Sequence, residues 1–181
     1  MVFVFLADGF EETEAIAPVD VMRRCGVEVY TVGVDSKTVT SSHKVTVTAD
    51  LSADECLKKA GKLEGVVLPG GMPGTLNLEK SELVQSFVKK AHDDGLILGA
   101  ICAAPSILGH LGYLDGKKAT CFPGFEKDLL GASYVNEPAV TDGTIITGKG
   151  AGAAIEFGLA LSAKLCGADK AQKVRESMQC P

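Results

Sequence analysis

Short apolar runs alternate with helix-like segments along almost the whole of this 181-residue chain. The runs typical of buried strands lie at 2–6, 27–32, 65–68, 96–101 and 144–147, and the segments typical of helices lie at 12–25, 53–60, 81–94, 103–111 and 153–166. Parallel strands joined by crossover helices produce this alternation, because helices cover both faces of such a sheet. The pattern predicts one α/β domain over residues 1–181, with ligands bound beyond the carboxyl ends of the strands. Two half-polar runs, at 37–40 and 44–48, predict a hairpin at an edge of the sheet.

Composition and length exclude several other classes of protein. With 46% hydrophobic and 23% charged residues the chain is too apolar to be disordered, and at its length it needs no metal or disulfide to build a core. A net charge of −5 argues against nucleic acid or an anionic membrane as a partner. Residues 1–6 lack the basic flank of a signal peptide, and no apolar run is long enough to span a membrane, so we expect a cytoplasmic protein.

The six cysteines have neither zinc-site spacing nor a C-x-x-C motif, so neither a metal site nor a disulfide framework is expected. Cys102 differs from the others because it stands where the predicted strand 96–101 meets the predicted helix 103–111. Ala100 and Ala104 flank it two residues away on each side, which is the spacing of a strained nucleophile elbow. The start of a helix would also lower the pKa of a thiol there. The alternative is a buried structural thiol, the commoner fate of cysteine.

Four acidic residues fall within seven positions after the first predicted strand, at 8, 11, 12 and 14. Glu11 and Glu12 fit a stabilising interaction with a helix N-terminus. Helical periodicity instead places Glu14 beside the apolar stripe of Pro18 and Val21, so its carboxyl is expected to point inward. Because two neighbouring anions repel, a carboxyl beside a thiolate would stay protonated and donate to sulfur. Glu14 is therefore the candidate acid/base group.

Two glycine-rich segments could suggest a nucleotide, but neither has the full pattern. The run 68–74 lacks the Lys-Ser/Thr ending of a P-loop, so we expect its glycines to bring backbone N–H groups to a substrate oxygen. The run 148–153 loosely fits G-x-G-x-x-A, yet no predicted strand follows it to complete a dinucleotide site. No cofactor is expected.

The histidines argue against a cysteine protease. His43 lies in the polar hairpin, His92 on an amphipathic helix, and His110 two turns along the helix from Cys102. A Cys-His dyad is therefore not predicted, and Glu14 takes the place of a histidine base.

These residues resemble the motifs of the ThiJ/PfpI superfamily, in particular the branch of the parkinsonism-associated deglycase. The matching segments are Glu11-Glu12-x-Glu14, the run 18–24, the run 67–71, the run 100–105 and Ile155-Glu156-Phe157. The resemblance covers essentially the whole chain. It implies a flavodoxin-like, three-layer α/β sandwich and a homodimer. Asp20 and Arg24, four residues apart, could serve an interface or simply pair within their helix.

The resemblance also implies roles for single residues. Cys102 matches the reactive, easily oxidised cysteine, Glu14 the carboxyl that hydrogen-bonds it, and Gly71 with Ala103 the backbone oxyanion donors. The substrate-pocket candidates are Gly70, Phe122, Pro123 and Lys149. Departures from the family pattern fall at Phe122, where some members have histidine, at Lys149 and His43, where arginine is common, and at Ala151, which replaces a proline. These departures bear on small-anion binding and on the choice of substrate.

Two functions share these residues. The first is a glutathione-independent glyoxalase that converts methylglyoxal to lactate, or a deglycase that removes such dicarbonyls from glycated proteins, with Cys102 as nucleophile and Glu14 moving the proton. The second is a redox sensor or holdase chaperone in which Cys102 is oxidised to a sulfinic acid. The third hypothesis is a binding protein without catalytic activity, which would require Cys102 to titrate like an ordinary thiol.

Overall fold

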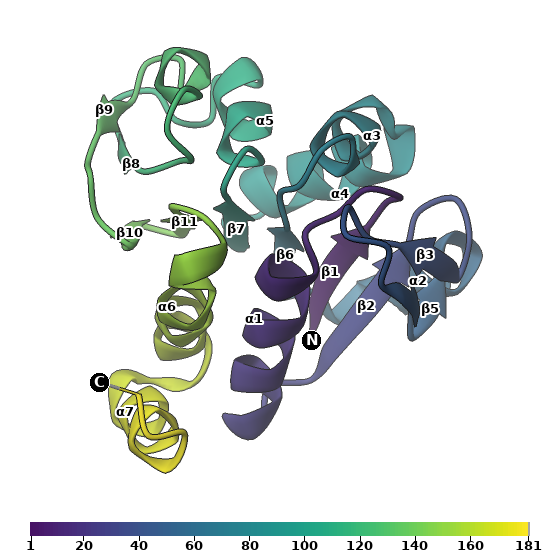
Figure 1. The fold of residues 1–181 in the computed structure, drawn as a ribbon, viewed down its shortest axis with the longest axis horizontal. Coiled ribbons are helices and arrows are strands. Elements are labelled where there is room, and N and C mark those ends of the chain that lie inside the picture. The colour runs from purple at the N-terminus through teal and green to yellow at the C-terminus, as the bar shows by residue number, and fades with distance from the viewer. Residues whose placement is uncertain (181) are drawn as a thin grey trace.

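The computed structural model describes residues 1–180 and has a seven-stranded central sheet (Figure 1). The sheet contains β1 (Val2–Leu6), β2 (Val29–Gly33), β5 (Leu51–Ser52), β6 (Gly65–Leu68), β7 (Ile97–Ile101), β10 (Ala139–Asp142) and β11 (Ile145–Gly148). The order across it is β10-β11-β7-β6-β1-β2-β5, and every pair is parallel except β10 with β11. The central run β2-β1-β6-β7-β11 has the flavodoxin-like order 2-1-3-4-5. The predicted α/β fold with a mostly parallel sheet is confirmed.

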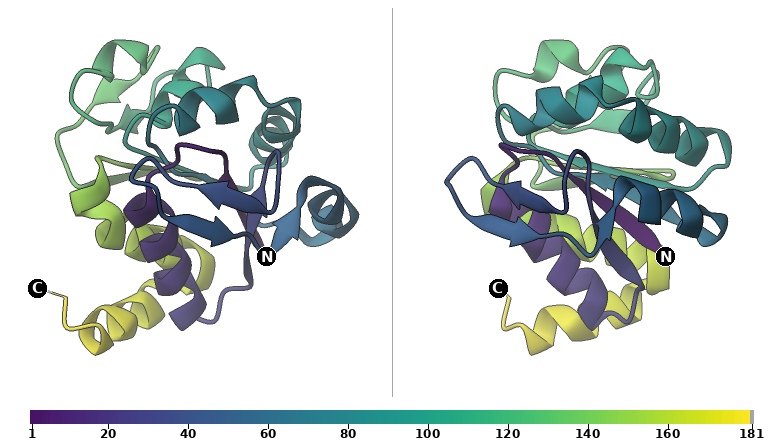
Figure 2. Two further views of the ribbon diagram at one scale, coloured as in Figure 1. Left: turned by 45° about the vertical axis from the view of Figure 1, so that its right-hand side comes forward. Right: turned by 90° about the vertical axis from the view of Figure 1, so that its right-hand side faces the viewer.

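Helices cover both faces of this sheet, as Figure 2 shows when the sheet is viewed edge-on. The helices are α1 (Glu12–Arg24), α2 (Ala53–Lys59), α3 (Gly74–Lys80), α4 (Glu82–Asp93), α5 (Pro105–His110), α6 (Ala154–Cys166) and α7 (Ala168–Ser177). Alternate residues of β1 point to opposite faces, as a strand requires. Phe3 and Phe5 pack against Phe87 of α4, whereas Val4 packs in the cluster that contains Val19 of α1 and Phe157 of α6. One buried core therefore lies on each side of the sheet.

Two small sheets lie outside the central one. The predicted hairpin forms as β3 (Thr38–Thr40) and β4 (Thr46–Thr48), but within residues 1–180 these strands pair only with each other. The edge of the central sheet is instead β5, which the sequence pattern did not indicate because it has only two residues. Strands β8 (Lys118–Ala119) and β9 (Ser133–Tyr134) form the other small sheet. Short 3-10 helices occupy Ala60–Lys62, Glu126–Asp128 and Ala151–Ala153.

Several elements were not predicted from the sequence. Helix α7 buries only Ala171 and Val174, so its apolar pattern is too sparse to recognise. Helix α3 follows directly on the glycine- and proline-rich turn, and β10 is a half-polar edge strand. Across residues 1–180, no helix combines the length and the apolar character that crossing a membrane requires.

Candidate active site

Cys102 stands at a strained turn immediately after β7. Its φ of +65° is in the left-handed region, which residues with side chains rarely adopt. Two backbone hydrogen bonds hold the turn: the Cys102 N–H donates to the carbonyl of Gly148 at 2.9 Å, and the Phe122 N–H donates to the carbonyl of Cys102 at 2.9 Å. The backbone thus has the strained conformation of the predicted elbow.

The expected acidification of this thiol by a helix start was wrong. Helix α5 begins at Pro105, three residues after the cysteine, so Cys102 is not in its first turn. Burial, and then the charge of the Glu14 carboxylate, raise the pKa of the Cys102 thiol to about 12, while the backbone N–H groups of Ala103 and Gly71 lower it. Desolvation and a neighbouring anion therefore outweigh the local N–H dipoles.

Glu14 points inward from the first turn of α1, as its place on the helix predicted. Its side chain is almost fully buried, and one carboxylate oxygen accepts a hydrogen bond from the Gly70 N–H at 3.0 Å. Burial raises the pKa of Glu14 to about 7, and the nearby charge of Glu11 acts in the same direction. Hydrogen bonds from the Cys102 thiol and the Gly70 N–H partly offset this increase.

Cys102 and Glu14 therefore titrate as one pair. Burial raises the pKa of both groups, and the negative charge of one disfavours ionisation of the other, so once Glu14 is ionised the pair holds one proton and one negative charge. In the resting arrangement the thiol donates to the carboxylate. Transfer of that single proton along the hydrogen bond produces a thiolate beside a protonated carboxyl without any exchange with solvent. Glu14 is thus positioned to deprotonate the thiol during the reaction, so the site does not need a thiolate that is already present at rest.

The glycines of the turn after β6 are required by close packing. A Cβ atom at Gly70 would lie 2.6 Å from Cys102 Cβ and 2.6 Å from Glu14 Oε2. Gly71 has a φ of +90°, which only glycine adopts readily, and its N–H points to the Cys102 sulfur together with that of Ala103. Both predicted oxyanion donors therefore lie beside the reacting atom.

A pocket of about 560 Å³ opens next to this pair. Its lining includes three of the predicted pocket residues, Phe122, Pro123 and Lys149, together with Gly150, Pro138 and Glu156. Gly150 connects the pocket to the pair, because a Cβ atom there would lie 3.3 Å from the Phe122 ring and 4.0 Å from Glu14 Oε1. The fourth predicted pocket residue, Gly70, contacts Cys102 and Glu14 directly and is not part of this lining.

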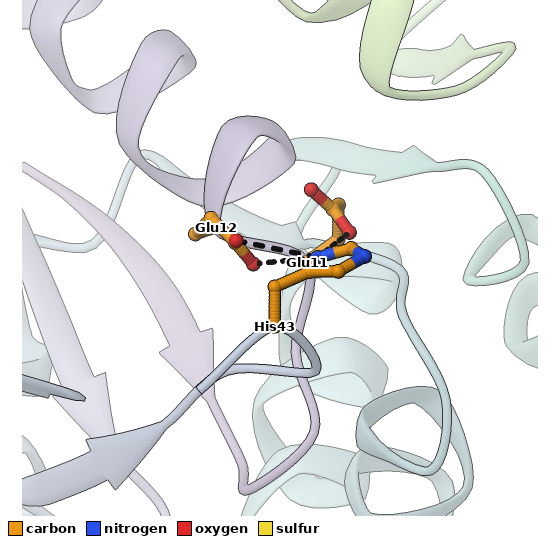
Figure 3. Close-up of side chains that lie close together, drawn as sticks. All are labelled: Glu11, Glu12 and His43. Atoms are coloured by element: carbon orange, nitrogen blue, oxygen red, sulfur yellow. Dashed lines mark hydrogen bonds and ion pairs between the residues drawn. The ribbon is translucent and has the colours of Figure 1, made fainter. Parts of the chain in front are cut away.

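A second polar cluster lies beside the start of α1, and Figure 3 shows the His43 ring next to the carboxylates of Glu11 and Glu12. His43 Nδ1 lies 3.3 Å from Glu11 Oε2 and 3.2 Å from Glu12 Oε1. His43 thus reaches from the hairpin to the acidic turn. Although its side chain is largely exposed, His43 has defined partners in these two carboxylates.

The other two histidines are engaged away from the cysteine. His92 stacks on Tyr113 with ring centroids 3.7 Å apart, and His110 Nδ1 lies 2.6 Å from the Glu79 carboxylate. Among residues 1–180, the recorded partners of these two rings do not include Cys102.

Sequence reasoning missed part of the pocket wall. Pro138, from the segment between β9 and β10, lines the pocket, and Asn136 from the same segment accepts a hydrogen bond from Nζ of the lining residue Lys149 at 2.6 Å. Glu156 belongs to a family motif but was not assigned to the site. No local sequence pattern marks Pro138, because only the folded path of the chain brings it to the pocket.

The fold and the pair define a class: α/β proteins of flavodoxin strand order with an elbow cysteine and a buried carboxyl at the carboxyl edge of the sheet. The chain belongs to the DJ-1/PfpI family, whose model matches residues 1–164. Protein dj-1beta of Drosophila melanogaster is 36% identical over 178 residues, which cover 97% of this chain and 94% of the relative. A deglycase of Thermococcus kodakarensis is 31% identical over 150 residues, which cover 82% of this chain and 89% of the relative. The crystal structure of a DJ-1 superfamily protein from Salmonella typhimurium matches with a TM-score of 0.92 at 36% identity. The match covers 99% of this chain and 98% of that one.

Proposed function

We propose that this protein is a cysteine-dependent, glutathione-independent glyoxalase and protein deglycase that acts on methylglyoxal and its adducts. The observation that carries the proposal is the pair formed by partly exposed Cys102 and buried Glu14, with the N–H groups of Gly71 and Ala103 directed at the sulfur. The pair needs a substrate whose carbonyl is electrophilic enough to react with a thiol that is mostly protonated. A 1,2-dicarbonyl meets this requirement, because each carbonyl activates the other.

The chemistry follows from the single shared proton. As the Cys102 sulfur attacks the aldehyde carbon, Glu14 takes the thiol proton and passes it to the new oxyanion, which gives a hemithioacetal and restores the Glu14 carboxylate. The Glu14 carboxylate then removes the proton on the former aldehyde carbon, which gives an enediol intermediate, and returns it to the neighbouring carbon. The hydroxyl proton moves from the first oxygen to the second in the same isomerisation, and the product is a lactoyl thioester. Water hydrolyses the thioester, so methylglyoxal and water become lactate and the thiol is restored. The Thermococcus relative bears the name deglycase, which supports the same activity on protein adducts here.

Lactate formation from methylglyoxal without glutathione tests this proposal. Cys102→Ala and Glu14→Gln should each lose at least ~10²-fold in kcat, the scale of a lost acid/base group. Cys180→Ser, which alters a partly exposed cysteine outside the pair, is the matched control and should keep the wild-type rate. Lactate production that continues at the wild-type rate in Cys102→Ala would contradict the proposal.

Oxidation of Cys102 is a second candidate function, favoured by the partial exposure of this residue beside two backbone N–H donors. A sulfinate at Cys102 could accept hydrogen bonds from these groups and from protonated Glu14. A neighbour of known structure, DJ-1 of Toxoplasma gondii, is described as oxidized. Mass spectrometry after mild peroxide tests this role, and equal sulfinic acid formation at all six cysteines would count against it.

We also propose the homodimer that the resemblance implies, with the outer face of α1 as part of the interface. Asp20 and Arg24 pair within this helix at 2.8 Å, whereas Ile16 has a 43% exposed apolar side chain. Light scattering should report a dimer for the wild type and a monomer for Ile16→Glu. A wild-type monomer at micromolar concentration would contradict this assembly.

A further inference from the structure

Two cysteines far apart in the sequence meet where α1 and α6 end. The two helices lie side by side on one face of the sheet and end on the same side of the molecule (Figure 1). Their close approach depends on Gly158, where a Cβ atom would lie 2.9 Å from Pro18 Cα. Cys25 is the C-cap of α1 and Cys166 is the last residue of α6.

Both thiols pack in one small apolar cluster with Val21, Leu159 and Val174. Both are free, and the Cys166 sulfur also donates a hydrogen bond to the Ser162 carbonyl at 3.0 Å. Burial raises the pKa of Cys166, and a direct hydrogen bond with the Cys25 thiol adds to that effect. Cys25 and Cys166, which carry no motif in the sequence, therefore form a contacting pair.

The two thiols differ in access to solvent. Cys25 is completely buried, whereas Cys166 is partly exposed and lines a surface hollow of about 630 Å³. Lys170 and Lys173 line the same hollow, and the charge of Lys170 favours the thiolate of Cys166. A small oxidant can therefore reach Cys166 from solvent, with Cys25 directly behind it.

We propose that Cys25 and Cys166 form a second redox site, separate from Cys102, in which a hydroperoxide oxidises Cys166 and Cys25 resolves the product as a disulfide. The Cys166 thiolate attacks the peroxide oxygen and releases hydroxide, which leaves a sulfenic acid. The Cys25 sulfur then attacks the sulfur of that sulfenic acid, and water leaves. In total, two thiols and one hydrogen peroxide give one disulfide and two waters. The bond joins the ends of α1 and α6 and protects Cys166 from further oxidation.

Peptide mapping after graded hydrogen peroxide tests the proposal. The full chain is oxidised, its remaining thiols are alkylated, and it is digested with trypsin without reduction. Cys25 and Cys166 fall in separate tryptic fragments, 25–37 and 165–170. We expect these two fragments to appear as one linked species that dithiothreitol separates, both in the wild type and in Cys102→Ala.

Two single variants make the assigned order of events testable. In Cys25→Ala, Cys166 should react with dimedone and then progress to sulfinic acid, because the resolving thiol is gone. In Cys166→Ser, Cys25 should remain reduced, because it has no exposed surface. Cys180→Ser should keep the link. The proposal is overturned if the linked species is absent at a dose that fully oxidises Cys102, or if Cys166 links instead to the fragment 176–181 that carries Cys180.

Discussion

Replacing Glu14 by glutamine should make the protein more stable above pH 7 while removing its activity. Burial raises the pKa of this carboxyl from its ordinary value of 4.5 to about 7, so the folded protein holds a proton that the unfolded chain has already released. Stability falls with rising pH wherever the folded state binds more protons than the unfolded state. The carboxyl therefore contributes most stability below pH 4.5, and this contribution is lost as the pH rises to about 7.

The size of this stability change follows from the difference between the two pKa values, 4.5 in the unfolded chain and about 7 in the folded protein. At about 1.4 kcal/mol for each pH unit, ionisation of the buried carboxyl costs the folded state about 3 kcal/mol once the pH is above 7. Glutamine has nearly the same shape, keeps an oxygen for the Gly70 N–H and carries no charge. Between pH 5.5 and pH 8, the free energy of unfolding of Glu14→Gln should therefore rise by about 2 kcal/mol relative to wild type.

Urea denaturation of both proteins across this pH range measures the difference directly. Glu12→Gln is the matched control on the same turn, since at Glu12 hydrogen bonds outweigh burial and lower the pKa. That variant should gain no stability at pH 8. If the wild-type and Glu14→Gln stabilities differ by a constant amount at every pH, or if Glu14→Gln is the less stable protein at pH 8, the reasoning about the buried carboxyl is refuted.

Three further predictions concern the same pair. In Cys102→Ala the pKa of Glu14 should rise above 7, because the thiol donor is lost, and NMR titration of the carboxyl carbon would detect this. For the wild type, kcat/KM with methylglyoxal should increase with pH around a midpoint near 7, and Glu14→Gln should lack that step in its pH–rate profile. In Gly70→Ala the new methyl group would lie 2.6 Å from both partners, so we expect a loss of roughly 1–3 kcal/mol in urea denaturation and of up to ~10²-fold in kcat/KM.

Much of the fold was predictable because its signals are local. The central strands β1, β6 and β7 are nearly continuous apolar runs, and helices such as α4 begin after a capping serine and end just before a glycine. Helix α7 and strand β10 were not predicted, because few of their residues are buried and their sequences therefore lack a hydrophobic periodicity.

The reactive pair was predictable for the same reason. Cys102 lies at a strand-to-helix junction between small residues, and Glu14 lies on the apolar stripe of its helix. Both positions depend on neighbours within a few residues along the chain. The family motifs are equally local, which is why the family could be recognised from the sequence.

Other properties depend on residues that only folding brings together. The sequence suggested an acidified thiol, but the tertiary structure begins α5 at Pro105 and buries Cys102 against Glu14, so the pKa of the thiol rises. The structure also places Pro138 in the pocket wall and brings Cys25 to Cys166. The sequence by itself therefore determined the family and picked out Cys102 and Glu14 as neighbours. Only the tertiary structure decided their electrostatics and partners, because desolvation and contact arise when distant segments pack together.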